Sequence, residues 1–184
     1  CAVFDFDGTI ISGYSATAFL RDQIARGELS PADLVQLTQA ATRFGIGSLG
    51  FSALMAVHAQ YLAGRSESDY IANSERLFRR AIAKLIYPEA RRLIEAHRAA
   101  GHSIAIISSA TPYQVLPAAK DLGINHVYAT NLEVIEDQFT GGVVTPTCFG
   151  IGKVQAAERF TDQQGTDLEN CFFYSDSTDD IELL

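Results

Sequence analysis

The distribution of apolar residues divides the chain into two parts of different character. A short apolar and aromatic run, Ala2–Phe6, precedes Gly8 and predicts a buried strand that feeds a turn. From about residue 13 to residue 84, the pattern is helical and no strand pattern interrupts it. Four helices are expected in that stretch, over Ser15–Arg26, Ser30–Phe44, Phe51–Ala63 and Glu67–Lys84.

After residue 85, short apolar runs alternate with amphipathic segments. Helices are expected over Pro88–Ala100, Pro112–Leu122 and Ile151–Phe160, and strands over Ser103–Ile107, His126–Ala129 and Cys171–Tyr174. Asn131–Ile135 and Gly142–Thr145 flank EDQFTG, which predicts a β-hairpin. This alternation predicts an α/β protein with a mostly parallel sheet, whose ligands bind beyond the carboxyl ends of the strands. We expect residues 1–12 and 86–184 to form the core, and residues 13–85 to form a helical cap inserted after the first strand.

Composition narrows the classes of protein to consider. With 184 residues, 47% of them hydrophobic and 20% charged, the chain fits one folded domain with a modest insertion. A net charge of −8 without a Lys/Arg cluster argues against a nucleic-acid partner. Three scattered cysteines indicate reduced thiols and a cytoplasmic location. No signal peptide or membrane-spanning segment is recognisable. We expect the chain to be a fragment, because it starts inside an apolar run and stops just after an acidic cluster.

Two aspartates at the end of the first strand carry the first indication of chemistry. Asp5 and Asp7 lie two positions apart, so that both carboxylates point toward the same side of the strand end. Like charges so close raise the pKa of one group, leaving one ionised nucleophile beside a group that holds a proton. The alternative for this pair alone is a solvated strand end with an Asp turn before Gly8.

Later polar residues fall where the same crevice would lie. Ser108 and Ser109 follow a predicted strand, and their hydroxyls and the adjacent N–H groups could bind a phosphoryl oxygen, although a helix cap is the alternative. Lys153 opens a predicted helix, where its charge opposes the helix dipole and calls for an anionic partner, unless it is simply solvated. Asp176 follows the last predicted strand, and with Asp5 it supplies the two carboxylates that Mg²⁺ commonly uses. Capping remains an alternative for Ser177 and Asp179.

The order of these motifs resembles the haloacid dehalogenase superfamily. DFDGT at residues 5–9, IISS ending at residue 109, Lys153 and SDSTDD at residues 175–180 follow its pattern over nearly the whole chain. The helical insertion and the SDSxxD pattern are similar to subfamily IB, which contains the phosphoserine phosphatases. The resemblance implies a Rossmann-like core under a helical cap and a phosphomonoester phosphatase. In such an enzyme Asp5 would attack phosphorus, and Asp7 would serve as general acid and base.

The same resemblance implies roles for the remaining motif residues. Ser108, next to Ser109, and Lys153 would hold phosphoryl oxygens. Mg²⁺ would be bound by the residues Asp5, Asp7 (through its backbone carbonyl) and Asp176. Asp180 would not bind the substrate itself but would hold the metal site or Lys153 in position.

The chain departs from phosphoserine-specific relatives at two positions. Tyr14 stands where they place a glutamate, and an ungapped match puts His58 where they place a carboxylate-binding arginine. We therefore expect weak phosphoserine turnover and assign Tyr14 and His58 to substrate specificity. Residues 34–64 contain only Arg43 and His58 as basic groups and no acid, which favours an uncharged or lipid-like phosphomonoester. The alternative is that these apolar side chains simply pack the cap helices together.

Three other readings stay open. The GYSA segment at residues 13–16 resembles bacterial fusions in which such a domain precedes an acyltransferase, and the domain could there be regulatory rather than catalytic. A signalling receiver domain also combines acids, a Ser/Thr and a Lys, but it has no cap. Gly45, Gly47 and Gly50 match GxGxxG, yet a helical pattern precedes them, so we expect a turn between cap helices rather than a dinucleotide site.

Overall fold

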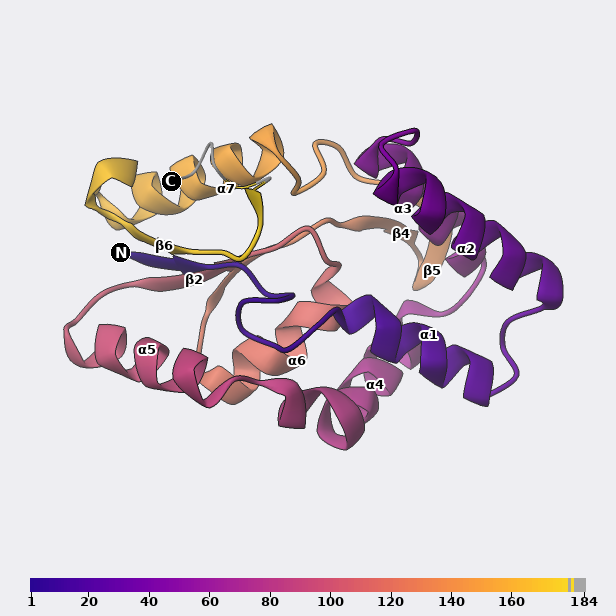
Figure 1. Ribbon diagram of the computed structural model, residues 1–184, viewed down its shortest axis with the longest axis horizontal. Helices are drawn as coiled ribbons and strands as arrows, with labels where there is room; N and C mark the ends of the chain where they lie inside the picture. Colours follow the sequence, from indigo (N-terminus) through magenta and orange to yellow (C-terminus); the bar gives the residue numbers. More distant parts are fainter. Residues whose placement is uncertain (179, 181–184) are drawn as a thin grey trace.

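A four-stranded parallel sheet forms the centre of the computed structural model, which describes residues 1–178 and 180 (Figure 1). The strands are β1 (Ala2–Phe4), β2 (Ile104–Ile107), β3 (His126–Tyr128) and β6 (Phe172–Tyr174), in the order β3-β2-β1-β6. In the register, Val3 lies opposite Ala105 on one side and Phe173 on the other. The predicted α/β class with a mostly parallel sheet is confirmed.

Helices cover both faces of the sheet, which explains why β1 and β2 are almost uniformly apolar. One face packs Phe4 and Ile106 against α5 (Pro88–Ala99) and α6 (Pro112–Leu122). The other packs Val3 and Ile107 against α7 (Ile151–Gln164), as Figure 1 shows with α7 and α5 on opposite sides. A short 3₁₀ turn, Leu168–Asn170, leads into β6. The acids that follow β1 are thereby anchored to the most buried part of the molecule.

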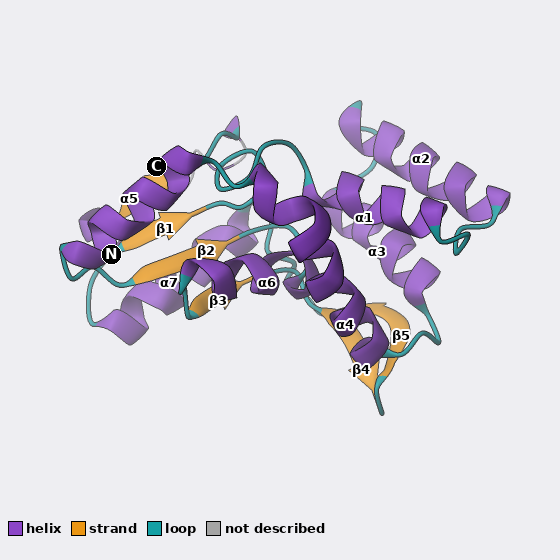
Figure 2. Cartoon of the chain, turned by 90° about the horizontal axis from the view of Figure 1, so that it is seen from below, coloured by secondary structure: helices purple, strands orange, loops and turns teal. Residues whose placement is uncertain are grey.

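Four helices lie beside the sheet rather than over its faces (Figure 2). They are α1 (Ser15–Ala25), α2 (Pro31–Gly45), α3 (Phe51–Leu62) and α4 (Glu67–Leu77). Ser30 and Asp33 form a capping box that starts α2. The predicted turn between α2 and α3 is confirmed, because Gly45, Gly47 and Gly50 connect the two helices. Across the described residues, no helix combines the length and apolarity that crossing a membrane requires.

The expected helix Glu67–Lys84 is wrong at its C-terminal end. A π-helical turn, Phe78–Ile82, and a 3₁₀ turn, Ala83–Leu85, follow α4 instead. Ile86 then pairs with Ile11, and the N–H of Tyr87 donates to the carbonyl of Ile10 at 2.9 Å. The wider turn and the tighter turn together rotate the chain so that it re-enters the core beside the segment that follows β1.

The hairpin is present, but its second strand begins earlier than the sequence pattern indicated. It consists of β4 (Leu132–Ile135) and β5 (Gln138–Val143), joined through Glu136 and Asp137 with φ of 48° and 64°. The expected start at Gly142 is wrong because an acid pair adopts the positive φ that a tight turn needs. β5 also lies along residues 64–67, with the Gly64 N–H donating to the Phe139 carbonyl at 2.8 Å. The hairpin thus packs against α3, and the domain boundaries drawn from the sequence stay a prediction.

Candidate active site

The acids predicted from the sequence meet at the carboxyl end of the sheet. Asp5 and Asp7 follow β1, Asp176 follows β6, and Lys153 lies in the first turn of α7. Because the strands are parallel, their carboxyl ends share one edge. A cavity of about 360 Å³ opens there, and its lining consists of Asp5, Asp7, Tyr14, Phe44, Phe51, Ser109, Phe149, Lys153, Asp176, Ser177, Thr178 and Asp180.

Lys153 lies between two carboxylates. Its Nζ is 3.1 Å from Asp5 Oδ1 and 2.7 Å from Asp180 Oδ2, and all three side chains are largely buried. Burial raises the pKa of Asp5 although Lys153 opposes the rise. Burial alone would lower the pKa of Lys153, but Asp5 and Asp180 outweigh it and raise that pKa. The lysine is therefore held as a cation beside Asp5, where a dianionic phosphoryl group would need positive charge.

Asp7 is held by hydrogen bonds from the start of α1. The N–H of Ser15 donates to Asp7 Oδ1 at 2.7 Å, and the Ser15 hydroxyl donates to Oδ2 at 3.1 Å. Gln114 Nε2 in turn donates to the Ser15 hydroxyl at 3.0 Å. Burial raises the pKa of Asp7 to about 6 despite these bonds. A carboxyl group with such a pKa can release and recover a proton near neutral pH.

Asp176 closes the other side of the Asp5–Asp7 turn. The Asp176 carboxylate accepts a hydrogen bond from the Thr9 hydroxyl at 3.2 Å. The Asp176 N–H donates to the oxygen of that Thr9 hydroxyl at 3.1 Å. A Cβ on Gly8 would lie 2.1 Å from Asp176 Oδ2, and Gly8 has φ of +75°. Only glycine allows this close approach, which brings the Asp176 carboxylate against the turn that carries Asp5 and Asp7.

The donor chemistry of this site fits a hard divalent cation. Asp5 and Asp176 line the cavity and offer carboxylate oxygens, and the backbone carbonyl of Asp7 stays a predicted third donor. Within residues 1–178 and 180, no cluster of three or more His, Cys, Asp or Glu side chains forms a ready metal site. A set of one or two carboxylates completed by carbonyl, phosphate and water oxygens is nevertheless the usual arrangement for Mg²⁺.

The two predicted serines occupy different environments. Ser108 is buried at the end of β2, where its hydroxyl accepts from the Ala110 N–H at 3.2 Å. Ser109 lines the cavity. Asp179, the other residue considered for capping, lies outside the described residues. Phosphate binding by Ser108 and Ser109 stays a prediction.

Tyr14 and His58, the residues assigned to specificity, are placed differently. Tyr14 lines the cavity and is 70% exposed. His58, on α3, is absent from the described cavity lining, and burial lowers its pKa to about 4. His58 is therefore uncharged at neutral pH, and an effect on substrate choice would have to be indirect.

Sequence reasoning missed three aromatic residues that line the cavity, here called the aromatic wall: Phe44, Phe51 and Phe149. The rings of Phe51 and Phe149 are stacked, with centroids 4.5 Å apart and planes at 11°. Phe44 meets each of them edge-on, with centroids 6.0 Å apart. Phe149 immediately precedes the segment that carries Lys153, which is the one sequence signal that could have pointed to it.

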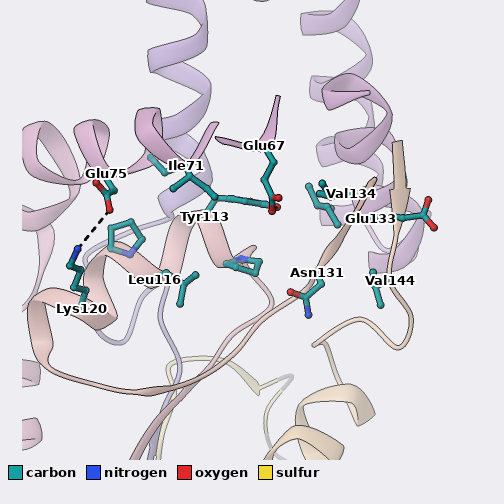
Figure 3. Close-up of a pocket in the computed structure, with 14 residues that line it drawn as sticks. Glu67, Ile71, Glu75, Tyr113, Leu116, Lys120, Asn131, Glu133, Val134 and Val144 are labelled. Carbon is teal, nitrogen blue, oxygen red and sulfur yellow. Dashed lines mark hydrogen bonds and ion pairs between the residues drawn. The ribbon is translucent and has the colours of Figure 1, made fainter. Parts of the chain in front are cut away.

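A larger pocket of about 560 Å³ lies elsewhere, between α4, α6 and the hairpin (Figure 3). Tyr113 points across it toward Glu67 and donates to that carboxylate at 2.7 Å. Lys120 lies 3.9 Å from Glu75 at its edge. No residue predicted for chemistry lines this pocket, so the smaller cavity is the candidate active site.

Comparison with known proteins identifies the family of the chain. The model of the haloacid dehalogenase-like hydrolases matches residues 2–184. The chain belongs to this family. As a haloacid dehalogenase-like hydrolase it is an enzyme, and its relatives include proteins named as phosphatases.

This hydrolase is phosphoserine phosphatase-like, as relatives named phosphoserine phosphatase indicate. Phosphoserine phosphatase SerB1 of Mycobacterium tuberculosis is 31% identical, over 100% of this chain and 61% of its own length. Histidinol-phosphatase of Neisseria meningitidis is 27% identical, over 100% of this chain and 85% of its own. A Bordetella pertussis protein of unknown function has a crystal structure that aligns with a TM-score of 0.89 and 25% identity, covering 99% of this chain and 84% of that one. The chain spans about three fifths of the length of its mycobacterial relatives.

Proposed function

We propose that this hydrolase is a Mg²⁺-dependent phosphomonoester phosphatase that works through an aspartyl-phosphate intermediate. The observation that carries the proposal is the pairing of Lys153 with Asp5 at 3.1 Å at the bottom of the cavity. A buried carboxylate beside a fixed cation has its negative charge matched before an anionic substrate arrives.

In the first step, a carboxylate oxygen of Asp5 attacks the substrate phosphorus and forms an acyl phosphate. The bond between phosphorus and the ester oxygen breaks on the opposite side. Asp7, whose pKa is raised to about 6, gives its proton to the leaving oxygen, so an alcohol departs. The Ser15 bonds keep the Asp7 carboxylate oriented toward this task.

In the second step, Asp7 accepts a proton from water, and the water oxygen attacks the phosphorus of the acyl phosphate. The bond between phosphorus and Asp5 breaks, which releases inorganic phosphate and restores the Asp5 carboxylate. Lys153 faces the phosphoryl oxygens throughout, while Asp180 holds its ammonium group at 2.7 Å. Ser108 and Ser109 are proposed to donate to the same oxygens.

Asp5, Asp176 and the backbone carbonyl of Asp7 would hold Mg²⁺. When bound, the cation supplies positive charge that offsets the charge on the transferring phosphoryl group. Thr9, through its bonds with Asp176, would keep that carboxylate in place. Removal of divalent cations is therefore expected to abolish turnover.

The names of the relatives support the reaction class rather than one substrate. One is named for phosphoserine and another for histidinol phosphate. We propose that this chain is not phosphoserine-specific, because Tyr14 is uncharged and His58 lies away from the cavity lining. A cytoplasmic location and a fused acyltransferase stay predictions, as do the activity and partners of the whole protein.

The test is phosphate release from a panel of phosphomonoesters with and without Mg²⁺, comparing the wild type with Asp5→Asn. We expect the variant to lose about 10⁴-fold or more of kcat, because the nucleophile is removed at nearly unchanged volume. Borohydride reduction of the quenched wild-type reaction should convert the acyl phosphate at residue 5 to homoserine. Mass spectrometry of the digested protein would detect homoserine at that position and so identify the phosphorylated residue.

Equal turnover by both proteins would overturn the assignment of Asp5. Absence of turnover by the folded wild type on every ester would favour a regulatory phosphate-binding domain instead.

A further inference from the structure

The aromatic wall combines residues from distant parts of the chain around one cavity. Phe44 lies in the last turn of α2, Phe51 begins α3, and Phe149 comes from the loop before α7. All three line the same cavity as Asp5 and Lys153. When the phosphoryl group of a substrate lies against Asp5, the leaving group of that substrate would therefore lie within reach of these rings.

The three rings are only partly buried, although Phe51 also packs against the main core. Met55 and Leu62 on α3 are 7% and 0% exposed and belong to the main core. The wall rings instead keep apolar surface open to the cavity. A ligand that covers this surface removes it from water, which favours binding, and a flat ring adds stacking contacts.

The charges around the cavity exclude one kind of leaving group. Lys153 is the one basic side chain among the described lining residues, and it already contacts Asp5 and Asp180. Asp176 adds a further carboxylate, which the proposed Mg²⁺ would share with Asp5. Lys153 and the proposed Mg²⁺ would both be occupied by the phosphoryl group, so a carboxylate on the leaving group would find no further basic side chain in the described lining to pair with, at a cost in affinity.

We propose that the aromatic wall is a substrate subsite that selects phosphomonoesters whose leaving group carries an aromatic ring and no carboxylate. This proposal rests on the proposed phosphatase function, since it concerns the leaving group of that reaction. Within the cap, Met55 and Leu62 are buried in the core, whereas Phe44 and Phe51 line the cavity, and Phe51 also packs against that core.

The first experiment measures binding without turnover. Calorimetry on Asp5→Asn with Mg²⁺ compares 2-phenylethyl phosphate with ethyl phosphate, which differ by one phenyl ring. We expect the phenyl compound to bind about tenfold more tightly or better, and phosphoserine to bind no better than ethyl phosphate. Equal dissociation constants for the first two compounds would overturn the subsite.

The second experiment measures the ratio of kcat/KM for the two esters in wall variants. Phe149→Ala should bring the ratio close to one, and Phe149→Leu should give an intermediate ratio because it keeps apolar volume without a ring. Phe172→Ala is the matched control, since Phe172 is 53% exposed on β6 and does not line the cavity. A ratio that is the same in all four proteins would overturn the proposal.

The two proposals fail separately. If the wild type hydrolyses neither ester while Asp5→Asn still binds the phenyl compound more tightly, the phosphatase function is wrong and the subsite stands. If the wild type hydrolyses both esters equally, or prefers phosphoserine, the subsite is wrong and the phosphatase function stands.

Discussion

The floor and the wall of the cavity are built on different physical grounds. The floor, which we call the acidic floor, consists of Asp5, Asp7, Lys153, Asp176 and Asp180, and the ion pairs of Lys153 with Asp5 and Asp180 are largely buried. The aromatic wall is a set of half-buried rings that contact one another by stacking, between Phe51 and Phe149, and edge-on through Phe44. In the floor, Asp5 and Asp180 depend on Lys153 for their counter-charge, whereas a ring of the wall can be exchanged for another apolar group. The chemistry of the reaction is thereby separated from the choice of substrate.

The strongest test of this contrast is Lys153→Met. Removing the cation leaves Asp5 and Asp180 buried without a counter-charge, and we expect a loss of about 3–5 kcal/mol in the free energy of unfolding. We also expect kcat/KM to fall by about 10²–10³-fold, because the charge facing the phosphoryl group is lost. Urea denaturation and phosphate release measure the two effects.

Lys120→Met is the matched control for that experiment. Lys120 is 82% exposed and lies 3.9 Å from Glu75, so its removal should change the free energy of unfolding by less than about 1 kcal/mol. If both variants were equally stable, the ion pairs of Lys153 would not contribute to the stability of the protein. The contrast between the acidic floor and the aromatic wall would then fail.

A second test uses the glycine that joins the floor to the wall. Gly152 lies between Phe149 and Lys153, and a Cβ there would be 1.9 Å from the Thr147 carbonyl oxygen. Gly152→Ala should therefore displace the loop before α7 and cost about 1–3 kcal/mol, as overpacking does. We expect a lower melting temperature together with a changed preference between the phenyl and ethyl esters.

Gly45→Ala provides the comparison for Gly152→Ala. Gly45 ends α2 without a positive φ, and a Cβ there would meet nothing within 4 Å. This change should be neutral or slightly stabilising, because alanine loses less backbone freedom on folding. A Gly152→Ala protein as stable as Gly45→Ala would show that the loop adapts and that floor and wall are not coupled there.

The same contrast explains which parts of the site could be predicted from the sequence. Asp5, Asp7 and Asp176 each follow an apolar run that forms a parallel strand, so the topology alone brings them to one edge. The wall has no such signal. Phe44 and Phe149 are 105 positions apart, and their contact depends on how the α2–α3 turn sits over the loop before α7.

The two errors in the fold have different physical origins. Residues 78–85 carry a helical pattern, yet the pairing of Ile86 with Ile11 forces the backbone into π and 3₁₀ turns. The predicted start of β5 was wrong because Glu136 and Asp137 form the turn with positive φ. A glycine at either position would have indicated such a turn in the sequence. A contact distant in sequence accompanies the first case, and a local turn accounts for the second.

The smallest expected effect concerns a cap residue that belongs to neither region. Burial lowers the pKa of His58 to about 4, below the ordinary value of 6.5. As the pH falls from 6.5 toward 4, the unfolded chain gains a proton at this histidine while the folded chain does not, so stability is lost over that window. His58→Gln cannot take up that proton and should lose less stability between pH 7 and pH 5 than the wild type does.

The measurement is the melting temperature of both proteins at pH 7 and pH 5, together with kcat/KM for the phenyl and ethyl esters. Because His58 does not line the cavity, we expect its replacement to change the preference between the esters by less than about twofold, as for a site without ligand contact. A large change in that preference would extend the specificity-determining region beyond the aromatic wall into α3, and the clear separation between cap packing and substrate contact would then be lost.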